Sequence, residues 1–338
     1  MLYLSGRIGE KNMRVFVTGG SGFIGTRVIE EISSLYPDAE VLNVDREEPK
    51  LSKHLQYWHK GDLLDSSTFM EAVKEFRPTH AIHMAARTDD SGTALDDYRV
   101  NMEGSANFIK AVKAAGSVER TVFYSSQYVV RPGPLPKSDR EYRPVNLYGE
   151  SKSRMEEMVR EDTGLPGIWT IVRPTNIWGP WHPRYAQEFW LVVKKGRYLH
   201  PGGAPVIRAY GYVGNVAEYT VKILAAPADA VSGKTFYLGD RPGDIKLWAS
   251  AFTRALTGRE PLVVPRPILR GIALIGDMVK ATGHSFPLFT SRYRSMTQSY
   301  LINMTPTIEV LGEAKYSLED GVEETVAWLK SLGGIWIS

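Results

Sequence analysis

Tyr148 and Lys152 are the residues in this sequence whose types and spacing point most directly to chemistry. They stand four apart in a segment expected to be helical to about Glu161, so both side chains lie on one helix face. A phenol is a poor base at its usual pKa of about 10, but a neighbouring ammonium group or other positive charge favours the phenolate. With Ser126, at the end of an expected strand over 119–125, they form a general acid/base set for interconverting an alcohol and a ketone. A tyrosine and a lysine at this spacing are also a common pair on helix surfaces, so the interpretation depends on a dinucleotide site elsewhere in the chain.

Such a site is indicated by residues 14–25, RVFVTGGSGFIG. A short β-branched and aromatic run leads into four glycines, at positions 19, 20, 22 and 25, and apolar residues at helical spacing follow. Glycine lets the backbone turn tightly and approach a pyrophosphate, and the N-terminus of the following helix offers unpaired N–H groups to that anion. A chance glycine-rich turn is the alternative interpretation.

Asp45 ends the next expected strand, over 40–44, about twenty residues past the last glycine. A carboxylate at that separation binds the two adenosine ribose hydroxyls and repels a 2′-phosphate, so it favours NAD over NADP. Arg46 follows at once and softens that preference. The alternative is an ordinary residue at the entry to a loop.

Asp62 lies at the end of a third expected strand, where it either contacts an adenine or caps the helix expected from Ser66 or Ser67 to Phe76. Position alone favours the cap. The fourth expected strand, over 80–86, ends in two alanines. Small side chains there let phosphates and ribose lie close to the backbone, although ordinary close packing also explains them.

Arg87 and Thr88 follow the fourth strand, where strand ends face the ligand crevice of a Rossmann sheet. Asn101 lies inside a helix expected over about 96–115. Because asparagine is a mediocre helix former, it either has a buried polar partner or faces solvent. Further along, residues 231–239 predict a last strand, and Ser317 begins an amphipathic closing helix to about Lys330.

Composition narrows the class of protein. The 338 residues suit one large or two modest domains, and 43% hydrophobic and 23% charged residues are ordinary for a globular protein. A net charge of +3 without a dense basic run gives no sign of nucleic-acid binding. The absence of cysteine excludes disulfides, thiolate metal sites and cysteine catalysis, and the histidines show no metal-ligand spacing. We expect a cytoplasmic protein without membrane insertion, since the apolar run 271–276 is too short to span a bilayer. Whether the polar residues 1–12 precede a natural start at Met13 stays open.

Taken together, these pieces resemble the extended short-chain dehydrogenase/reductase family, in its branch of nucleotide-sugar epimerases and dehydratases. The matching stretches, in family order, are TGGSGFIG at 18–25, Asp45, Asp62-Leu63, HMAA at 83–86, Asn101, Ser125-Ser126, Tyr148 with Lys152, and RPTNIWGP at 173–180. The resemblance implies an α/β fold: a doubly wound parallel Rossmann sheet in residues 1–175, and a smaller, interleaved substrate domain in most of 176–338. It also implies that the chain returns to the Rossmann part near 209–226.

The same resemblance implies roles for individual residues. Tyr148 is the acid/base, Lys152 binds the nicotinamide ribose, and Ser126 rather than Ser125 is the catalytic serine. Asp62 becomes an adenine contact instead of a cap. The implied NAD-binding residues are Gly19, Gly22, Phe23, Ile24, Gly25, Asp45, Arg46, Asp62, Leu63, Ala85, Ala86, Arg87, Asn101, Tyr148, Lys152 and Pro174. The implied substrate-binding residues are Thr88, Ser126, Asn176, Arg208 and Arg292, and no metal is expected.

Within that set, Asn176 holds a phosphate or sugar and Arg208 holds the nucleotide diphosphate, because a planar fork of donors suits phosphate oxygens. Arg292 is either a second diphosphate ligand or a surface charge. Trp178 and Trp181 are candidates to pack on a sugar or base, with core packing expected for at least one. The acidic residue usual near position 215 is an asparagine here, which affects how this segment docks on the Rossmann domain.

Departures from the family pattern select among its reactions. Gln127 and Tyr128 follow Ser126 where similar dehydratases carry an Asp-Glu pair and similar decarboxylases a glutamate, so dehydration and decarboxylation are disfavoured. What remains is oxidation and re-reduction at one carbon, the reaction of a nucleotide-sugar 4-epimerase that retains NAD. Rival interpretations are a reductase of a sugar or small carbonyl, a steroid-type dehydrogenase, favoured only by the apolar segment 268–279, and a redox-sensing binding protein. Related enzymes dimerise through the helices that carry Asn101 and Tyr148, so a homodimer is expected.

Overall fold

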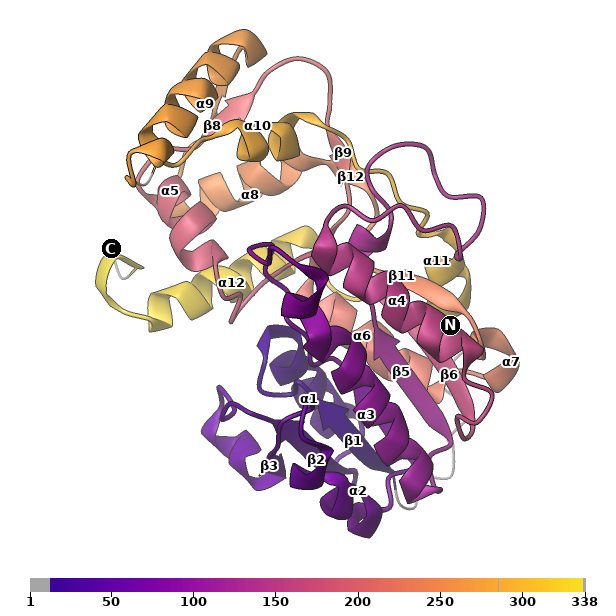
Figure 1. Cartoon of the computed structure of the whole chain (residues 1–338). Helices are drawn as coiled ribbons and strands as arrows, with labels where there is room; N and C mark the ends of the chain where they lie inside the picture. The colour runs from indigo at the N-terminus through magenta and orange to yellow at the C-terminus, as the bar shows by residue number, and fades with distance from the viewer. Residues whose placement is uncertain (1–12, 285, 337–338) are drawn as a thin grey trace.

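A seven-stranded parallel sheet forms the centre of the chain in a computed structural model that describes residues 13–284 and 286–336 (Figure 1). The strand order is β11-β6-β5-β4-β1-β2-β3. The order reverses between β1 and β4, and open sheets of this type bind ligands in the crevice outside the carboxyl ends of their strands at that point. The strands are β1 (Arg14–Thr18), β2 (Glu40–Asp45), β3 (Trp58–Lys60), β4 (His80–His83), β5 (Arg120–Tyr124), β6 (Ile168–Pro174) and β11 (Thr235–Leu238). The expected doubly wound Rossmann fold is confirmed.

Helices cover both faces of this sheet, as a parallel sheet requires. On one face α1 (Phe23–Leu35) packs against α6 (Val213–Ala225) and buries Val28, Ile29 and Ile32. On the other lie α2 (Met70–Phe76), α3 (Arg99–Ala115) and α4 (Leu147–Glu161), which bury Phe108 and Met155 (Figure 1). Short helices η1 (Ser52–Tyr57), η2 (Ser66–Thr68), η3 (Leu95–Tyr98), η4 (Gln127–Val129) and α7 (Ala228–Val231) join these elements.

The second half of the chain builds a smaller unit above the carboxyl ends of the strands (Figure 1). Its core is aromatic, with Trp178, Trp190 and Phe252 packed edge to face or tilted. Three strand pairs support it: β7 (Asn176–Trp178) with β10 (Tyr210–Tyr212), β8 (Leu199–Pro201) with β13 (Leu262–Val264), and β9 (Ile207–Arg208) with β12 (Gly243–Asp244). The helices of this unit are η5 (Ala186–Trp190), α5 (Leu191–Lys194), α8 (Ile245–Thr257), α9 (Arg266–Ala281), α10 (Thr290–Thr297), α12 (Leu318–Ser331) and η6 (Gly334–Trp336). Helix α11 (Thr305–Leu311) instead packs beside β11 and α6 of the Rossmann part (Figure 1).

Element boundaries follow the sequence with a few corrections. The closing helix is confirmed, since Ser317 caps α12 in a capping box with Asp320. The expected strand over 80–86 is wrong at its end: β4 stops at His83, and the chain then crosses close above the glycine turn, where Met84 N–H donates to the Thr18 carbonyl. The strand expected over 231–239 is confirmed but shorter, at Thr235–Leu238, and it is not the last one, because β12 and β13 follow. The polar stretch 1–12 lies outside the described residues. Across the part of the chain that the structure does describe, no helix combines the length and apolar character needed to cross a bilayer.

A buried ion pair ties the helix of Tyr148 and Lys152 to the sheet. Arg173 of β6 donates to both carboxylate oxygens of Glu156 on α4, at 2.8 and 2.7 Å, and both side chains are almost fully buried. Arg173 also donates to the carbonyl of Asp139, which anchors the proline-rich loop that precedes α4. A bidentate arginine–carboxylate pair fixes orientation as well as distance.

Replacing Glu156 with alanine should destabilise the protein by about 3–5 kcal/mol, because Arg173 would remain buried without its partner. Chemical denaturation of the variant and the wild type measures the difference. Glu150→Ala on the same helix is the matched control: it breaks the exposed Glu150–Arg154 pair and should change stability by no more than about 0.5 kcal/mol. Equal effects of the two substitutions would contradict this account.

Candidate functional site

The glycine turn between β1 and α1 leaves no room for side chains. Gly19 has a φ of +78°, and a Cβ on it would lie 2.6 Å from the backbone nitrogen of Ala85. A Cβ on Gly25 would collide with the Gly19 carbonyl oxygen. Gly22 precedes α1 without a capping side chain, so the first N–H groups of the helix are left for an anion. The turn therefore fits the pyrophosphate of a dinucleotide.

Asn43 is a site residue that the sequence interpretation missed. This fully buried side chain accepts a hydrogen bond from Gly20 N–H at 2.9 Å and donates to Ser21 Oγ at 3.1 Å, so it holds the glycine turn in shape. The signal was a polar residue in the middle of a buried strand. Asp45, two residues on, accepts from the backbone N–H of Ser21 and Glu47 at 3.1 Å each. Burial raises the pKa of Asp45, and the carboxylate lies at the strand end where a ribose is expected.

Around this turn lie the other residues expected at the cofactor. Phe23 packs edge-on against His182 with ring centroids 5.0 Å apart, Ile24 and Pro174 are part of the packed surroundings, and Arg46 is exposed. The Leu63 side chain is buried in the core, while its carbonyl accepts from Asn107. Position alone made Asp62 a helix cap, which is wrong. Asp65 caps η2 through Ser67 N–H, and the Asp62 carboxylate, half-exposed, accepts from Leu64 N–H.

Asn101 is buried and has polar partners, which settles the alternative left open by the sequence. Its side chain brackets Arg87, accepting from the Arg87 N–H at 2.8 Å and donating to the Arg87 carbonyl at 3.0 Å. Its second N–H donates to Ser151 on α4 at 2.9 Å. The Arg87 guanidinium turns into its own loop and pairs with Asp89, while Thr88 is exposed and Ala85 and Ala86 are half-buried. Asn101 therefore holds the crossing strand end against α4.

Ser126, Tyr148 and Lys152 are brought together by η4 and α4. The Ser126 hydroxyl caps η4, accepting from Tyr128 N–H at 3.1 Å, and it hydrogen-bonds the Tyr148 phenol. Burial raises the pKa of Tyr148 to about 12, and the Ser126 hydrogen bond opposes that rise. Burial lowers the pKa of Lys152 to about 8, opposed by the nearby Glu156 carboxylate. Without a further positive charge, the phenol therefore keeps its proton at neutral pH.

A wall of phenols lines the site beside this trio, and the sequence interpretation did not find it. The rings of Tyr128 and Tyr98 lie 6.2 and 6.3 Å from that of Tyr148, centroid to centroid. Three more tyrosines, Tyr185, Tyr210 and Tyr300, continue the wall from the substrate side. Burial raises the pKa of each of these phenols, the Tyr128 phenol raises it further, and the Arg208 charge lowers it. The wall therefore reaches from Tyr148 to Arg208.

Arg208 is nine-tenths buried on β9 and lies over the Tyr300 ring. One guanidinium nitrogen donates to the Ser295 carbonyl, whereas the buried Nε has no partner among the described residues. No carboxylate among the residues that the structure describes forms an ion pair with Arg208. The side-chain amide oxygen of Asn176 accepts a hydrogen bond from the side-chain amide of Gln127 at 3.0 Å. Arg292 pairs with Glu188 and is partly exposed.

Of the two tryptophans considered as sugar platforms, Trp178 is fully buried among Tyr212, Trp248 and Phe252, so the expected core packing of at least one is confirmed. Trp181 instead packs against Trp328. Asn215, at the start of α6, donates to Asp240 and exchanges hydrogen bonds with the Tyr316 backbone. The segment thus docks through an amide in place of a carboxylate.

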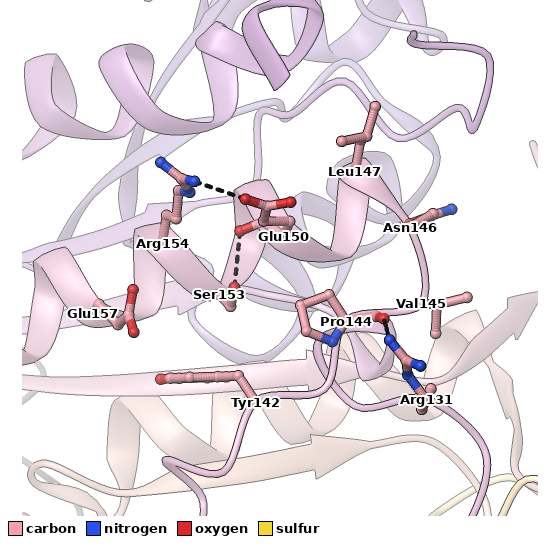
Figure 2. A pocket seen from close by; sticks show the side chains of 10 residues that line it. All are labelled: Arg131, Tyr142, Pro144, Val145, Asn146, Leu147, Glu150, Ser153, Arg154 and Glu157. Carbon is pink, nitrogen blue, oxygen red and sulfur yellow. Dashed lines mark hydrogen bonds and ion pairs between the residues drawn. The ribbon is translucent and has the colours of Figure 1, made fainter. Parts of the chain in front are cut away.

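Figure 2 shows a shallow hollow of about 620 Å³ on the outer side of α4. Glu150, Ser153, Arg154 and Glu157 line it from the helix, and Arg154 turns toward Glu150. None of the trio lines it, since Tyr148 and Lys152 face the sheet side of the same helix. The hollow is therefore separate from the site described above.

Fold and site together define a dinucleotide-binding protein of the Rossmann class. A glycine turn at the switch point of a Rossmann sheet is combined there with a serine–tyrosine–lysine trio. The sequence profile of the NAD dependent epimerase/dehydratase family matches residues 15–239. The chain therefore belongs to this family, and NAD is its cofactor.

Individual relatives differ in what they do. The chain is 26% identical to a decarboxylating sterol-4-alpha-carboxylate 3-dehydrogenase of Saccharomyces cerevisiae, over 93% of this chain and 97% of the relative. It is 24% identical to the N-acetyl-alpha-D-glucosaminyl-diphospho-ditrans,octacis-undecaprenol 4-epimerase of Escherichia coli O157:H7, over 94% and 95%. The structure of a Thermus thermophilus UDP-glucose 4-epimerase in complex with NAD superposes with a TM-score of 0.69 at 24% identity, over 95% of this chain and all of the other. The fold is thus common to dehydrogenases and epimerases.

Binding of NAD⁺ should bring a positive charge to the Tyr148 phenol and lower its pKa from about 12. Ultraviolet difference spectra at mildly alkaline pH should then show a phenolate signal on addition of NAD⁺ and a weaker one with NADH, whose ring is neutral. Tyr148→Phe should abolish the signal while still binding NAD⁺. A signal of the same size in the variant would assign the titrating phenol to another tyrosine of the wall.

Proposed function

We propose that the protein is an NAD-dependent epimerase that inverts C4 of a sugar carried on a diphosphate, through a transient 4-keto sugar. The observation that supports this most is Arg208, a buried cation without a carboxylate partner in the described structure. A buried charge left unpaired is costly, so such a residue is suited to a ligand that supplies the negative charge. A diphosphate matches both the charge and the fork of donors.

The residues of the site divide the work. Tyr148 takes the proton from the C4 hydroxyl, directly or through Ser126, whose hydrogen bond steadies the phenolate. The bound dinucleotide supplies the hydride acceptor and returns the hydride. Lys152, the buried third member of the trio, supplies positive charge one helical turn from the phenol and binds the nicotinamide ribose. Return of the proton from Tyr148 completes the cycle without a second substrate.

Gln127 and Tyr128 support epimerisation over dehydration. The Gln127 side chain is buried and donates to Asn176, and neither Gln127 nor Tyr128 offers a carboxylate for the acid–base step of a dehydration. The keto sugar instead meets the partly exposed rings of the phenol wall, those of Tyr128, Tyr185 and Tyr210, which can pack on either face of a sugar ring. This suits an intermediate that must turn over before the hydride returns.

Purified protein, without added NADH, should interconvert C4 isomers of a diphosphate-linked hexose. The panel should hold UDP-, GDP-, dTDP- and CDP-hexoses and an undecaprenyl-diphosphate sugar, with the products followed by NMR. Tyr148→Phe should lose about 10²–10⁴-fold in rate while keeping NAD. If no member of the panel yields C4 isomers, the proposed reaction is wrong.

Arg208→Met should raise KM for the diphosphate-linked substrate roughly 10- to 100-fold, the equivalent of losing charge-assisted hydrogen bonds of about 1.5–3 kcal/mol. The value of kcat should change little, because Arg208 lies away from the reacting carbon. Arg294→Met, an exposed arginine on α10, is the matched control and should leave KM unchanged. A drop in kcat alone for Arg208→Met would contradict diphosphate binding at this residue.

A steroid-type dehydrogenase is the second candidate, supported by the aromatic wall and by the similarity to the yeast sterol dehydrogenase. It would convert NAD⁺ to NADH stoichiometrically with a hydroxysteroid, and Arg208→Met would then leave its KM unaltered. The same KM measurement therefore separates the two candidates.

We further propose the domain division at about residue 175 and a homodimer formed through the outer faces of α3 and α4. In support, α6 packs on α1 and β11 joins the sheet beside β6, so part of the second half lies with the Rossmann sheet. The hollow on α4 in Figure 2 lies on the face that would meet the partner.

A further inference from the structure

Helix α9 turns one apolar face into the protein and another out to solvent. Leu269, Ala273 and Gly276 are buried, packed with Leu288 from the segment before α10. Residues at helical spacing on the opposite side are uncovered. With the neighbouring strand β13, the exposed apolar side chains are Leu262, Val263, Ile268, Leu274, Ile275 and Met278, each between 45% and 71% exposed. We call these six residues the α9 face. Core packing therefore explains only the inward-facing residues of the apolar segment 268–279 and leaves its outward-facing residues without an explanation.

The α9 face lies at the outer end of the substrate unit, away from the Rossmann sheet (Figure 1). It is nevertheless joined to the anion-binding residue by two contacts. Asp277 of α9 accepts from Thr290 N–H at the start of α10, and Ser295 at the other end of α10 accepts from Arg208. A ligand held at the α9 face would thus lie one helix away from Arg208.

Charge in this region is opposite in sign to that of the rest of the chain. Residues 245–299 hold eight lysines and arginines against two acidic residues, a net charge of +6. Because the whole chain carries +3, the remaining residues together carry −3. Both acidic residues have local partners: Glu260 pairs with Arg254, and Asp277 accepts from Thr290. Arg270 is exposed on the flank of the α9 face. An apolar helix face bordered by cations is the pattern of helices that lie in the interface of an anionic bilayer.

We propose that the α9 face docks the protein on the surface of a bilayer that contains anionic lipids, with α9 lying parallel to the membrane plane. Six apolar side chains enter the boundary between headgroups and acyl chains, and Arg270 with its neighbouring cations meets the lipid phosphates. Docking of this kind needs no spanning helix. The proposal does not depend on the reaction catalysed, because it concerns a surface outside the site.

Co-sedimentation of the full chain with vesicles tests this, without substrate, so that the outcome is independent of the proposed reaction. The protein should bind vesicles of phosphatidylcholine mixed with phosphatidylglycerol at least about tenfold more tightly than phosphatidylcholine alone, and added salt should weaken binding. Ile275→Glu with Met278→Glu should weaken binding about tenfold or more, and Arg270→Glu should lower the preference for the anionic vesicles.

The matched control is Leu35→Glu with Leu55→Glu, two leucines of the Rossmann half that are about as exposed and should not matter. Retained NAD binding shows that each variant is folded. Equal sedimentation of wild type and the Ile275→Glu, Met278→Glu variant, or no sedimentation of the wild type, would overturn the proposal. If the wild type does not bind vesicles but light scattering shows an assembly that the variant loses, the α9 face would belong to a second copy of the chain.

Discussion

A buried chain of hydrogen bonds from β1 to α4, the helix of Tyr148 and Lys152, is the constraint on which the rest of this site depends. It runs, in order, through Thr18 Oγ1, His83 Nδ1 and Nε2, Ser105 Oγ, the Asn101 carbonyl and side-chain amide, Ser151 Oγ and the Tyr148 carbonyl, with links of 2.7 to 2.9 Å. His83 is fully buried, and burial holds its pKa well below the usual value, so the ring is neutral and can accept at one nitrogen while donating at the other. Buried polar groups are costly unless satisfied, so these groups hold one arrangement. The glycine turn and Tyr148 are thereby fixed to each other.

Helix α4 is also anchored at a second point, by an ion pair to β6. Glu156 lies one turn beyond Lys152 and is bound by Arg173, so α4 is anchored to β6 at Glu156 and to α3 at Ser151, which accepts from Asn101. Lys152 lies between these two anchors, almost fully buried. The position of α4 therefore determines both the desolvation that lowers the Lys152 pKa and the Glu156 carboxylate that raises it. The charge state of Lys152 thus follows from how α4 packs on the sheet.

What the sequence could predict follows from how local each feature is. The glycine turn, Asp45, and Tyr148 with Lys152 are short-range patterns, and resemblance to a family placed Ser126 and Arg208. Asn43 and the strand end at His83 depend on neighbours from other strands, which no local pattern encodes. The phenol wall is more remote still: the Tyr300 hydroxyl donates to the carbonyl of Gln127, 173 residues earlier, and such contacts exist only once the sheet and the substrate unit have been assembled. The outward half of α9 was missed for the same reason, since helical spacing alone does not say which apolar face is covered.

The two halves of the chain meet over the cofactor helix itself. Phe23 packs on His182, and Arg27, one turn further along α1, pairs at 3.0 Å with Glu324 of α12. The substrate unit thus packs on the helix that follows the glycine turn, so α1 contacts both the substrate unit and the turn that fits the pyrophosphate. These contacts fix the substrate unit relative to the glycine turn. They leave the choice of substrate to the phenol wall and Arg208. The relatives of this chain include a sterol dehydrogenase and a 4-epimerase. Our proposal of an epimerase for this chain therefore depends on the phenols and on Arg208, whose buried Nε has no partner among the described residues.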